Sequence, residues 1–335
     1  MAETEAKYHH LIPQTYMSAW ANGSGTLKVE FKNNPGVITE RNKERIAGIT
    51  DFHSIRAGMP LCTEDDAKTI FSSVLGYTVE CNGEKLAGPL DLNKHYYEFD
   101  KWIITRLDGS VVSKRQIKHT IDQVKIRDIE ANWSTKYENS WNQEVKKIES
   151  SVLHAPNGSL KAFDREYLMR FYTALDWRGF SSNREFEDLY QKLTGGVLDQ
   201  VEIPESERIL PSLSTASDEI RHCLLLQYYR KYLDDTGVIF EDANANLAHT
   251  NFHFLVSDGS AKFNTCDSPA FIHTRKDGQL VGLLPITPRI MMAKGRCTDE
   301  NELFYITHIT DAAVEQYNEA IWNSAEEFII LPNCT

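Results

Sequence analysis

The stretch from Thr250 to Ala293 reads TNFHFLVSDGSAKFNTCDSPAFIHTRKDGQLVGLLPITPRIMMA, and it decides the fold class. Apolar and polar residues alternate in short runs separated by turn residues, which is typical of β-strands. The strands are expected at residues 250–257, 261–265, 269–274, 279–284 and 289–294, with turns at Asp258-Gly259, Asp267-Ser268 and Asp277-Gly278. This pattern predicts an antiparallel meander.

In the region before this meander, the apolar residues recur with a different spacing. From Ile117 to Ile148 the apolar residues recur mostly every three or four positions, which predicts one long amphipathic helix or two. Further helices are expected at about residues 164–177, 182–193 and 217–233. After Gly237 the apolar residues again recur at every second position. Residues 113–235 are therefore interpreted as a helical block.

The two ends of the chain complete the pattern. A short helix is expected from Pro13 to Ala21, a strand over residues 26–31, and a hairpin at Asn82-Gly83. Near the C-terminus a helix is expected over residues 311–325 and a strand over residues 328–331. Strands and helices that are segregated in this way indicate an α+β fold, in which N-terminal strands and a C-terminal β-meander (250–335) surround the central helical block. No long Pro/Gly/Ser-rich stretch divides the chain, so a single compact unit over residues 1–335 is expected.

The amino-acid composition excludes several classes of protein. The 335 residues carry a net charge of −12, from 36 basic and 48 acidic side chains. This balance argues against a general DNA coat protein and against binding to an anionic membrane, although a small basic cleft is compatible with it. The sequence has no secretory signal, no membrane-length apolar run and no repeated cysteine spacing among its six cysteines. A cytoplasmic protein without disulfides is expected.

Several well-known site motifs are missing from the sequence. It has no P-loop, no G-x-G-x-x-G after a strand, no G-x-S-x-G and no H-E-x-x-H, which disfavours Walker ATPases, Rossmann oxidoreductases and α/β-hydrolases. The cysteines form no C-x-x-C pair. His249 and His253 would share one face of a strand, but two histidines are a weak metal signal. We therefore predict no metal site, and the sequence identifies no cofactor and no oligomeric state.

Four segments carry a resemblance to a known family. Residues 9–17 read HHLIPQTYM, residues 175–184 read LDWRGFSSNR, residues 265–269 read TCDSP, and residues 317–320 read YNEA. They resemble, in order, the motifs H-[HY]-x-[VI]-P-Q-x-Y-L, L-x-R-[TS]-P-x-x-R, [TS]-x-D-[NS]-P and L-N-x-x of the domain of unknown function 4238 family, found in bacteria and fungi. Met17 replaces the first motif's Leu, and the second lacks its Pro. The family implies no reaction.

The candidate catalytic residues come from the first and third motifs. His9 or His10 could act as a general base, contact a phosphate or bind a metal, while the other packs structurally. Gln14 could donate to a substrate oxygen or to neighbouring backbone. Asp267 could orient a histidine at the edge of a cleft, or it could simply cap backbone N–H groups in its turn.

The candidate substrate-binding residues are Arg178, Arg184 and Tyr16. The planar guanidinium of Arg178 suits a phosphate or carboxylate, and its alternative role is an ion pair with Asp176 or another carboxylate. Arg184 has acidic neighbours, Glu185 and Glu187, that could neutralise it. Tyr16 could equally belong to the core.

Two hypotheses for function follow from these residues. In the first, they converge in a cleft and perform acid–base chemistry on an anionic substrate, as in a nuclease-like or phosphoester-cleaving hydrolase. The resemblance adds the expectation of an effector in bacterial self-defence. In the second, the same residues hold an anionic ligand such as a nucleotide in a non-catalytic sensor or binding protein. A purely structural phage or host protein is a third alternative, in which these polar residues would be scattered in space.

Overall fold

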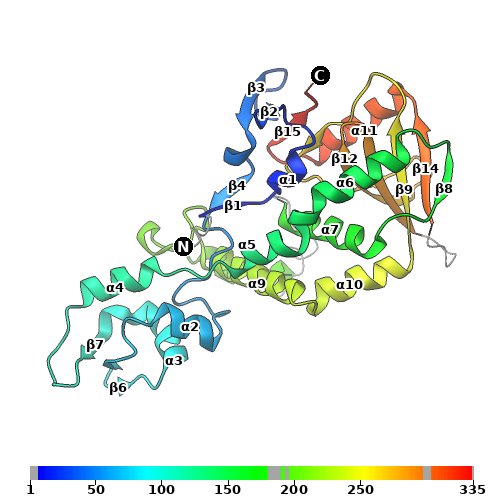
Figure 1. The fold of residues 1–335 in the computed structure, drawn as a ribbon. Helices are drawn as coiled ribbons and strands as arrows, with labels where there is room; N and C mark the ends of the chain where they lie inside the picture. Colours follow the sequence, from blue (N-terminus) through cyan, green and yellow to red (C-terminus); the bar gives the residue numbers. More distant parts are fainter. Residues whose placement is uncertain (1–6, 180–189, 193–195, 297–302, 334–335) are drawn as a thin grey trace. The chain divides into compact units, whose positions relative to one another are not determined.

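The protein is described from a computed structural model, over residues 7–179, 190–192, 196–296 and 303–333 (Figure 1). Contacts divide the chain into two compact units. Unit 1 comprises residues 1–7, 51–132 and 194–231, and unit 2 comprises residues 8–50, 133–193 and 232–335. Each unit is described by itself, and the expectation of one compact unit over residues 1–335 stays a prediction.

A six-stranded sheet forms the centre of unit 2. Its strand order is β11-β12-β13-β9-β14-β8. Neighbouring strands are antiparallel except β9 and β14, which run parallel. The strands are β8 (Gly158–Leu160), β9 (Thr250–Ser257), β11 (Phe271–Thr274), β12 (Leu280–Thr287), β13 (Ile290–Arg296) and β14 (Phe304–Ile309). The late meander is therefore present as β11-β12-β13, and β9 joins it beside β13.

The central strands β9, β12 and β13 have consecutive buried residues, and since side chains alternate across a strand, both faces of the sheet are covered there. Leu255, Leu283 and Met291 point to the face covered by α11 (Asp311–Ser324), where they pack with Val314 and Ile321. On the other face, α7 (Arg165–Arg178) contacts the sheet (Figure 1). Its Tyr172 hydroxyl donates to the Phe271 carbonyl oxygen. The sheet is thus the middle layer of unit 2.

A second sheet joins the two ends of the chain. Its strand order is β10-β15-β2-β3, and all pairs are antiparallel. The strands are β2 (Thr26–Phe31), β3 (Ile38–Asn42), β10 (Thr265–Cys266) and β15 (Phe328–Leu331). A two-stranded ribbon, β1 (Tyr8–His10) with β4 (Gly48–Thr50), holds the N-terminal segment. The remaining helices of unit 2 are α1 (Gln14–Met17), η1 (Lys43–Arg45), η3 (Ser134–Glu138), α6 (Asn139–Val152) and α10 (Gly237–Ala248).

Unit 1 is built around a small sheet of order β6-β5-β7, made of β5 (Thr78–Cys81), β6 (Glu84–Lys85) and β7 (Trp102–Thr105). Phe71, Tyr96, Phe99 and Trp102 form an aromatic cluster beside it. Its helices are α2 (Glu64–Ile70), α3 (Pro89–Lys94), η2 (Tyr96–Lys101), α4 (Lys114–Gln123), α5 (Asp128–Trp133), η4 (Val197–Gln200), η5 (Glu205–Glu207) and most of α9 (Ala216–Leu233).

The structure confirms the α+β class, and it also corrects some element boundaries. Of the two alternatives expected from Ile117 to Ile148, the structure rules out a single long helix, because Val124 is extended and Ile126 pairs its backbone with Ile55 in both directions. Residues 237–248 form a helix where period two was expected, because only Ile239 and Ala243 are buried and this stripe is too sparse to read. Of the strand expected over 261–265, only Thr265 is in a strand. Most of the helix expected over 182–193 lies outside the described residues.

Within the described part of the chain, every helix is too short or too polar to cross a membrane.

We expect Tyr16→Phe to destabilise unit 2, because the buried Tyr16 hydroxyl bonds the Thr265 hydroxyl at 2.7 Å and donates to the Pro285 carbonyl oxygen at 2.7 Å. Leaving these partners unsatisfied costs about 1–3 kcal/mol. Urea unfolding monitored by tryptophan fluorescence measures the loss. Tyr97→Phe is the matched control, because Tyr97 is 63% exposed. Equal stability of the two variants would contradict this prediction.

Candidate functional site

The first predicted residues, His9 and His10, lie in β1 and pair with Ile49 and Gly48 of β4. Although adjacent strand residues point to opposite faces, both side chains are buried. Gln14 lies at the start of α1, four residues later, and its Nε2 is 2.8 Å from Nε2 of His10. His10 and Gln14 are therefore direct neighbours, with Gln14 half-buried beside the buried imidazole.

Arg178 is the last residue of α7, and it is 2% exposed. Its Nη1 donates to Oε1 of Glu138 at 2.6 Å, and its Nη2 donates to the backbone carbonyl oxygen of His10. The guanidinium carbon also lies 4.9 Å from the centre of the Trp133 ring. A buried cation needs such partners, since an unpaired charge in the interior is strongly unfavourable.

The position of Glu138 depends on an unusual turn. Residues Ser134–Glu138 form a π-helical segment between α5 and α6. A π-segment inserts a residue into a helix and thereby rotates the following side chains, and such segments are frequent at functional sites. Trp133 lies just before the segment and Glu138 ends it, so two of the three partners of Arg178 come from this turn and its N-terminal flank. Ordinary helical spacing, with contacts every three or four residues, does not predict this pairing.

Asp267 is fully buried and acts as an acceptor for backbone N–H groups. Its carboxylate receives hydrogen bonds from the backbone N–H groups of Glu326, Glu327 and Phe328, at the start of β15. Burial raises the pKa of the Asp267 carboxyl, while these three hydrogen bonds act in the opposite direction. The expected capping concerned N–H groups of the turn itself, whereas Asp267 caps the distant N–H groups that precede and begin β15.

The four segments that carry the family resemblance meet in unit 2. Tyr16 bonds Thr265, and Arg178 bonds the His10 carbonyl oxygen. The next residue, Gly179, adjoins the late turn: a Cβ there would be in ordinary contact with the Asp267 carbonyl oxygen at 3.6 Å and the Ser268 hydroxyl at 3.4 Å. Asn318 then anchors the terminal helix, since its side chain accepts from the N–H of Asn264 and donates to the Lys262 carbonyl oxygen.

These contacts link His10, Gln14 and Arg178 with Glu138 in one network, whereas Tyr16 bonds Thr265 and Pro285, and Asp267 bonds the backbone of residues 326–328. The contact between Arg178 and His10 runs through the backbone of His10, and Tyr16 belongs to the core. Arg184 lies outside the described residues. The catalytic and substrate-binding roles assigned to these residues stay predictions. Glu138 is the member of the network that the sequence did not reveal.

A second cluster of charges, in unit 1, was also missed. We call it the Asp51 cluster: Asp51, Arg56, Lys125 and Arg127. Asp51 is buried in a left-handed conformation, with φ of 57°. Its carboxylate accepts hydrogen bonds from Nζ of Lys125 and, at 3.0 Å, from Nη2 of Arg127. It also lies 3.9 Å from Nη2 of Arg56.

The backbone explains why these side chains meet. Ile55 and Ile126 exchange two backbone hydrogen bonds of 2.9 Å, which join the two extended segments. Lys125 and Arg127 flank Ile126 and therefore extend to the same side, toward Asp51. The two cations lower the pKa of Asp51 to about 2, overcoming the opposing effect of burial. The alternation in Lys125-Ile126-Arg127 was the only sequence signal for this site.

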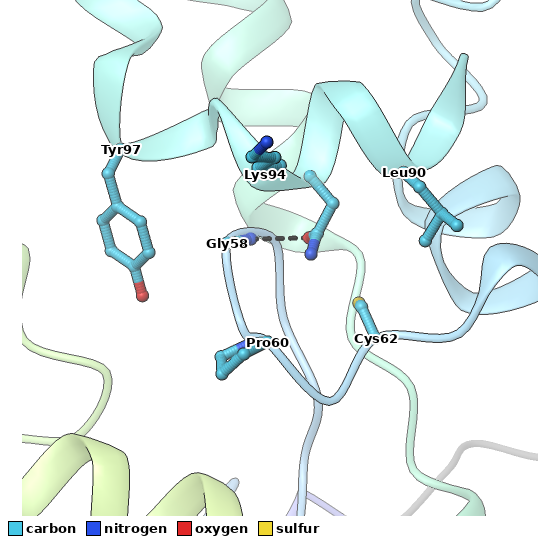
Figure 2. Close-up of a pocket in the computed structure, with 7 residues that line it drawn as sticks. Gly58, Pro60, Cys62, Leu90, Lys94 and Tyr97 are labelled. Carbon is cyan, nitrogen blue, oxygen red and sulfur yellow. Dashed lines mark hydrogen bonds between the residues drawn. The ribbon is translucent and has the colours of Figure 1, made fainter.

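Unit 1 also contains an open pocket of about 500 Å³ (Figure 2). It is lined by Gly58, Pro60, Cys62, Leu90, Asn93, Lys94 and Tyr97. The Asn93 amide is used internally, since it accepts from the N–H of Gly58 and donates to the Met59 carbonyl oxygen. Burial raises the pKa of the Cys62 thiol to about 12, so this cysteine is not an activated nucleophile. The pocket offers mainly apolar surface, with Lys94 as its one charged lining residue.

We expect Arg178→Ala to destabilise the protein by about 3–5 kcal/mol, because it leaves the Glu138 carboxylate and the His10 carbonyl oxygen without their shared partner. Arg178→Lys retains the charge but not the two-pronged geometry, so an intermediate loss is expected. Thermal and urea unfolding measure both. An Arg178→Ala variant that keeps wild-type stability but loses a measurable activity would instead identify Arg178 as a functional residue.

Comparison with known proteins completes the description. No curated protein and no solved structure matches the chain. The profile of a family described as "Protein of unknown function (DUF4238)" matches residues 8–333, nearly the whole sequence and all four motif segments. The chain therefore belongs to the DUF4238 family.

Proposed function

We propose that this protein binds a small anionic ligand, such as a nucleotide or another phosphorylated molecule, at the Asp51 cluster. The observation that carries the proposal is the charge balance of the cluster. Three cationic side chains contact or approach one carboxylate, in a chain whose net charge is −12. A local excess of positive charge in an acidic protein is best explained by a negative partner.

The surroundings of the cluster contain charges of both signs. Burial and the Arg127 charge lower the pKa of Arg56, while Asp51, Asp122 and Glu219 act to raise it. Asp122 also accepts from the Tyr96 hydroxyl, and Glu219 accepts from the N–H of Ile209, whereas Lys125 and Arg127 bond Asp51 directly. An added anion would offset the repulsion among the cations.

The side chains of the cluster also suggest the class of ligand. The planar guanidinium groups of Arg56 and Arg127 match the oxygens of phosphate or carboxylate, and Lys125 adds a point charge. Their side chains are 24%, 14% and 20% exposed, so they remain within reach of a small molecule. A small ligand is favoured over a long nucleic acid, whose binding requires an extended basic surface. The proposal places this activity in the cytoplasm, where nucleotides are abundant.

We expect ATP, inorganic pyrophosphate and inorganic phosphate to raise the melting temperature in a concentration-dependent way, because a ligand that binds the folded state stabilises it. Lys125→Gln should weaken the binding of the best of these ligands by about tenfold, as measured by calorimetry at constant ionic strength. Lys68→Gln is the matched control, because it removes one lysine charge from an exposed position that pairs with Glu64 and Asp65.

Two outcomes would contradict the proposal. One is the absence of saturable binding by all three anions. The other is an equal loss of affinity in Lys125→Gln and Lys68→Gln, which would indicate a non-specific effect of net charge.

Phosphoester cleavage is a second candidate function, with a defence role against foreign nucleic acid as its biological setting. The observation in its favour is the contact network of unit 2, in which His10 and Gln14 adjoin Arg178 and Glu138. Gln14 and Glu138 are only partly buried, so the network reaches the surface. The His10 imidazole contacts Gln14 and the His10 carbonyl oxygen contacts Arg178, so an imidazole, a guanidinium and a carboxylate, the groups needed for acid–base chemistry on a phosphodiester, come from linked residues.

We expect cleavage of RNA, DNA or nucleotides by this network to be lost in His10→Gln, with a smaller loss in Gln14→Ala. Product formation, followed with and without added divalent metal, measures it. His119→Gln serves as the control, since His119 is exposed on α4. Saturable ligand binding without any turnover would reject the hydrolase and leave the binding function as the better proposal.

A further inference from the structure

Three potential metal ligands lie together in unit 1, away from the Asp51 cluster. They are Cys81 at the end of β5, His95 directly after α3, and Glu98 in η2. One donor atom from each of these residues lies within 4.8 Å of the other two. Nδ1 of His95 is 3.2 Å from Oε2 of Glu98. Around a tetrahedral zinc ion, donor atoms lie roughly 3.2–3.7 Å apart, so a small adjustment brings all three to one ion.

The fold explains how residues 14 and 17 positions apart in sequence come together. Cys81 lies opposite Trp102 in the β5–β7 pairing, and the Trp102 indole N–H donates to the His95 carbonyl oxygen at 3.0 Å. Trp102 is almost fully buried, so it is a rigid link between the strand and the helix end. Glu98 has a non-helical backbone within η2, with φ of −100° and ψ of 21°.

Hydrogen bonds to Oε1 already fix the orientation of the Glu98 carboxylate. Oε1 accepts from Nζ of Lys101 at 2.7 Å and from Nδ2 of Asn82 at 3.4 Å, whereas Oε2 faces His95. Outer hydrogen bonds of this kind orient a carboxylate ligand toward a metal. The carboxylate can therefore offer Oε2 to an ion without losing its other contacts.

We propose that Cys81, His95 and Glu98 bind a zinc ion through Sγ, Nδ1 and Oε2, with a fourth position open to solvent. One thiolate, one neutral imidazole and one carboxylate are ligands that zinc prefers, and together they neutralise its charge. On binding, zinc displaces the thiol proton of Cys81 to solvent, and His95 carries its ring proton on Nε2. The side chains of His95 and Glu98 are 32% and 36% exposed, which gives the ion a route in and leaves room for a bound water.

The test uses the full-length protein and Co²⁺, which replaces zinc and reports thiolate ligation by absorption. We expect one Co²⁺ per chain, a thiolate-to-cobalt charge-transfer band, tetrahedral d–d bands, and loss of both when Zn²⁺ is added. Cys81→Ser should abolish the charge-transfer band. His95→Gln and Glu98→Gln should each weaken Co²⁺ binding by at least about tenfold.

Matched controls separate this site from other metal-binding residues. Cys223→Ser and His119→Gln remove the same residue types elsewhere in unit 1 and should leave the Co²⁺ spectrum unchanged. Because His95 and Glu98 are partly exposed, their variants keep the test valid even if Cys81→Ser fails to fold. A charge-transfer band that persists in Cys81→Ser, or folded wild-type protein that shows no band, would overturn the proposal. Anion binding at the Asp51 cluster does not depend on this result.

Discussion

The buried guanidinium of Arg178 is the interaction on which unit 2 depends. A cation in the interior must be paired, and its partners come from two distant parts of the chain. Glu138 supplies the negative charge from a π-helical turn, His10 supplies a backbone carbonyl oxygen from the N-terminal ribbon, and Trp133 supplies an aromatic face. The turn, the ribbon and the end of α7 are therefore coupled, so a change at one of them alters the other two.

The residues that resemble the family motifs have a structural explanation in this coupling. Asp267 caps the start of β15, Tyr16 bonds Thr265, and Gly179 at the end of α7 adjoins the late turn. Buried polar groups of this kind are costly unless all their hydrogen bonds are made. A family whose motifs form such a network can share a fold without sharing a reaction, which is why a binding function is proposed at a different set of residues.

Unit 1 holds the proposed anion-binding site and the proposed zinc site. At the Asp51 cluster, two extended segments bring three cations to one carboxylate, whose pKa of about 2 keeps it charged over the physiological range. At Cys81, His95 and Glu98, a strand end and a helix end bring together soft and hard metal ligands. Both sites depend on backbone pairing, at Ile55–Ile126 and in the β5–β7 ladder, rather than on a local sequence motif.

The sequence by itself determined the elements whose patterns are local. Period-two alternation predicted β9, β12 and β13, the Asn82-Gly83 pair predicted the β5–β6 hairpin, and helical spacing predicted α7 and α11. It also identified His10, Gln14 and Arg178 as unusual polar residues. Only the tertiary structure decided the partners of Arg178, because the His10 carbonyl oxygen and the Glu138 carboxylate leave no periodic signal in the sequence. The same holds for the Ile55–Ile126 bridge that assembles the Asp51 cluster. Long-range pairing also decided against a single long helix after Ile117, since the hydrogen bonds that a helix would use at Ile126 are made with Ile55.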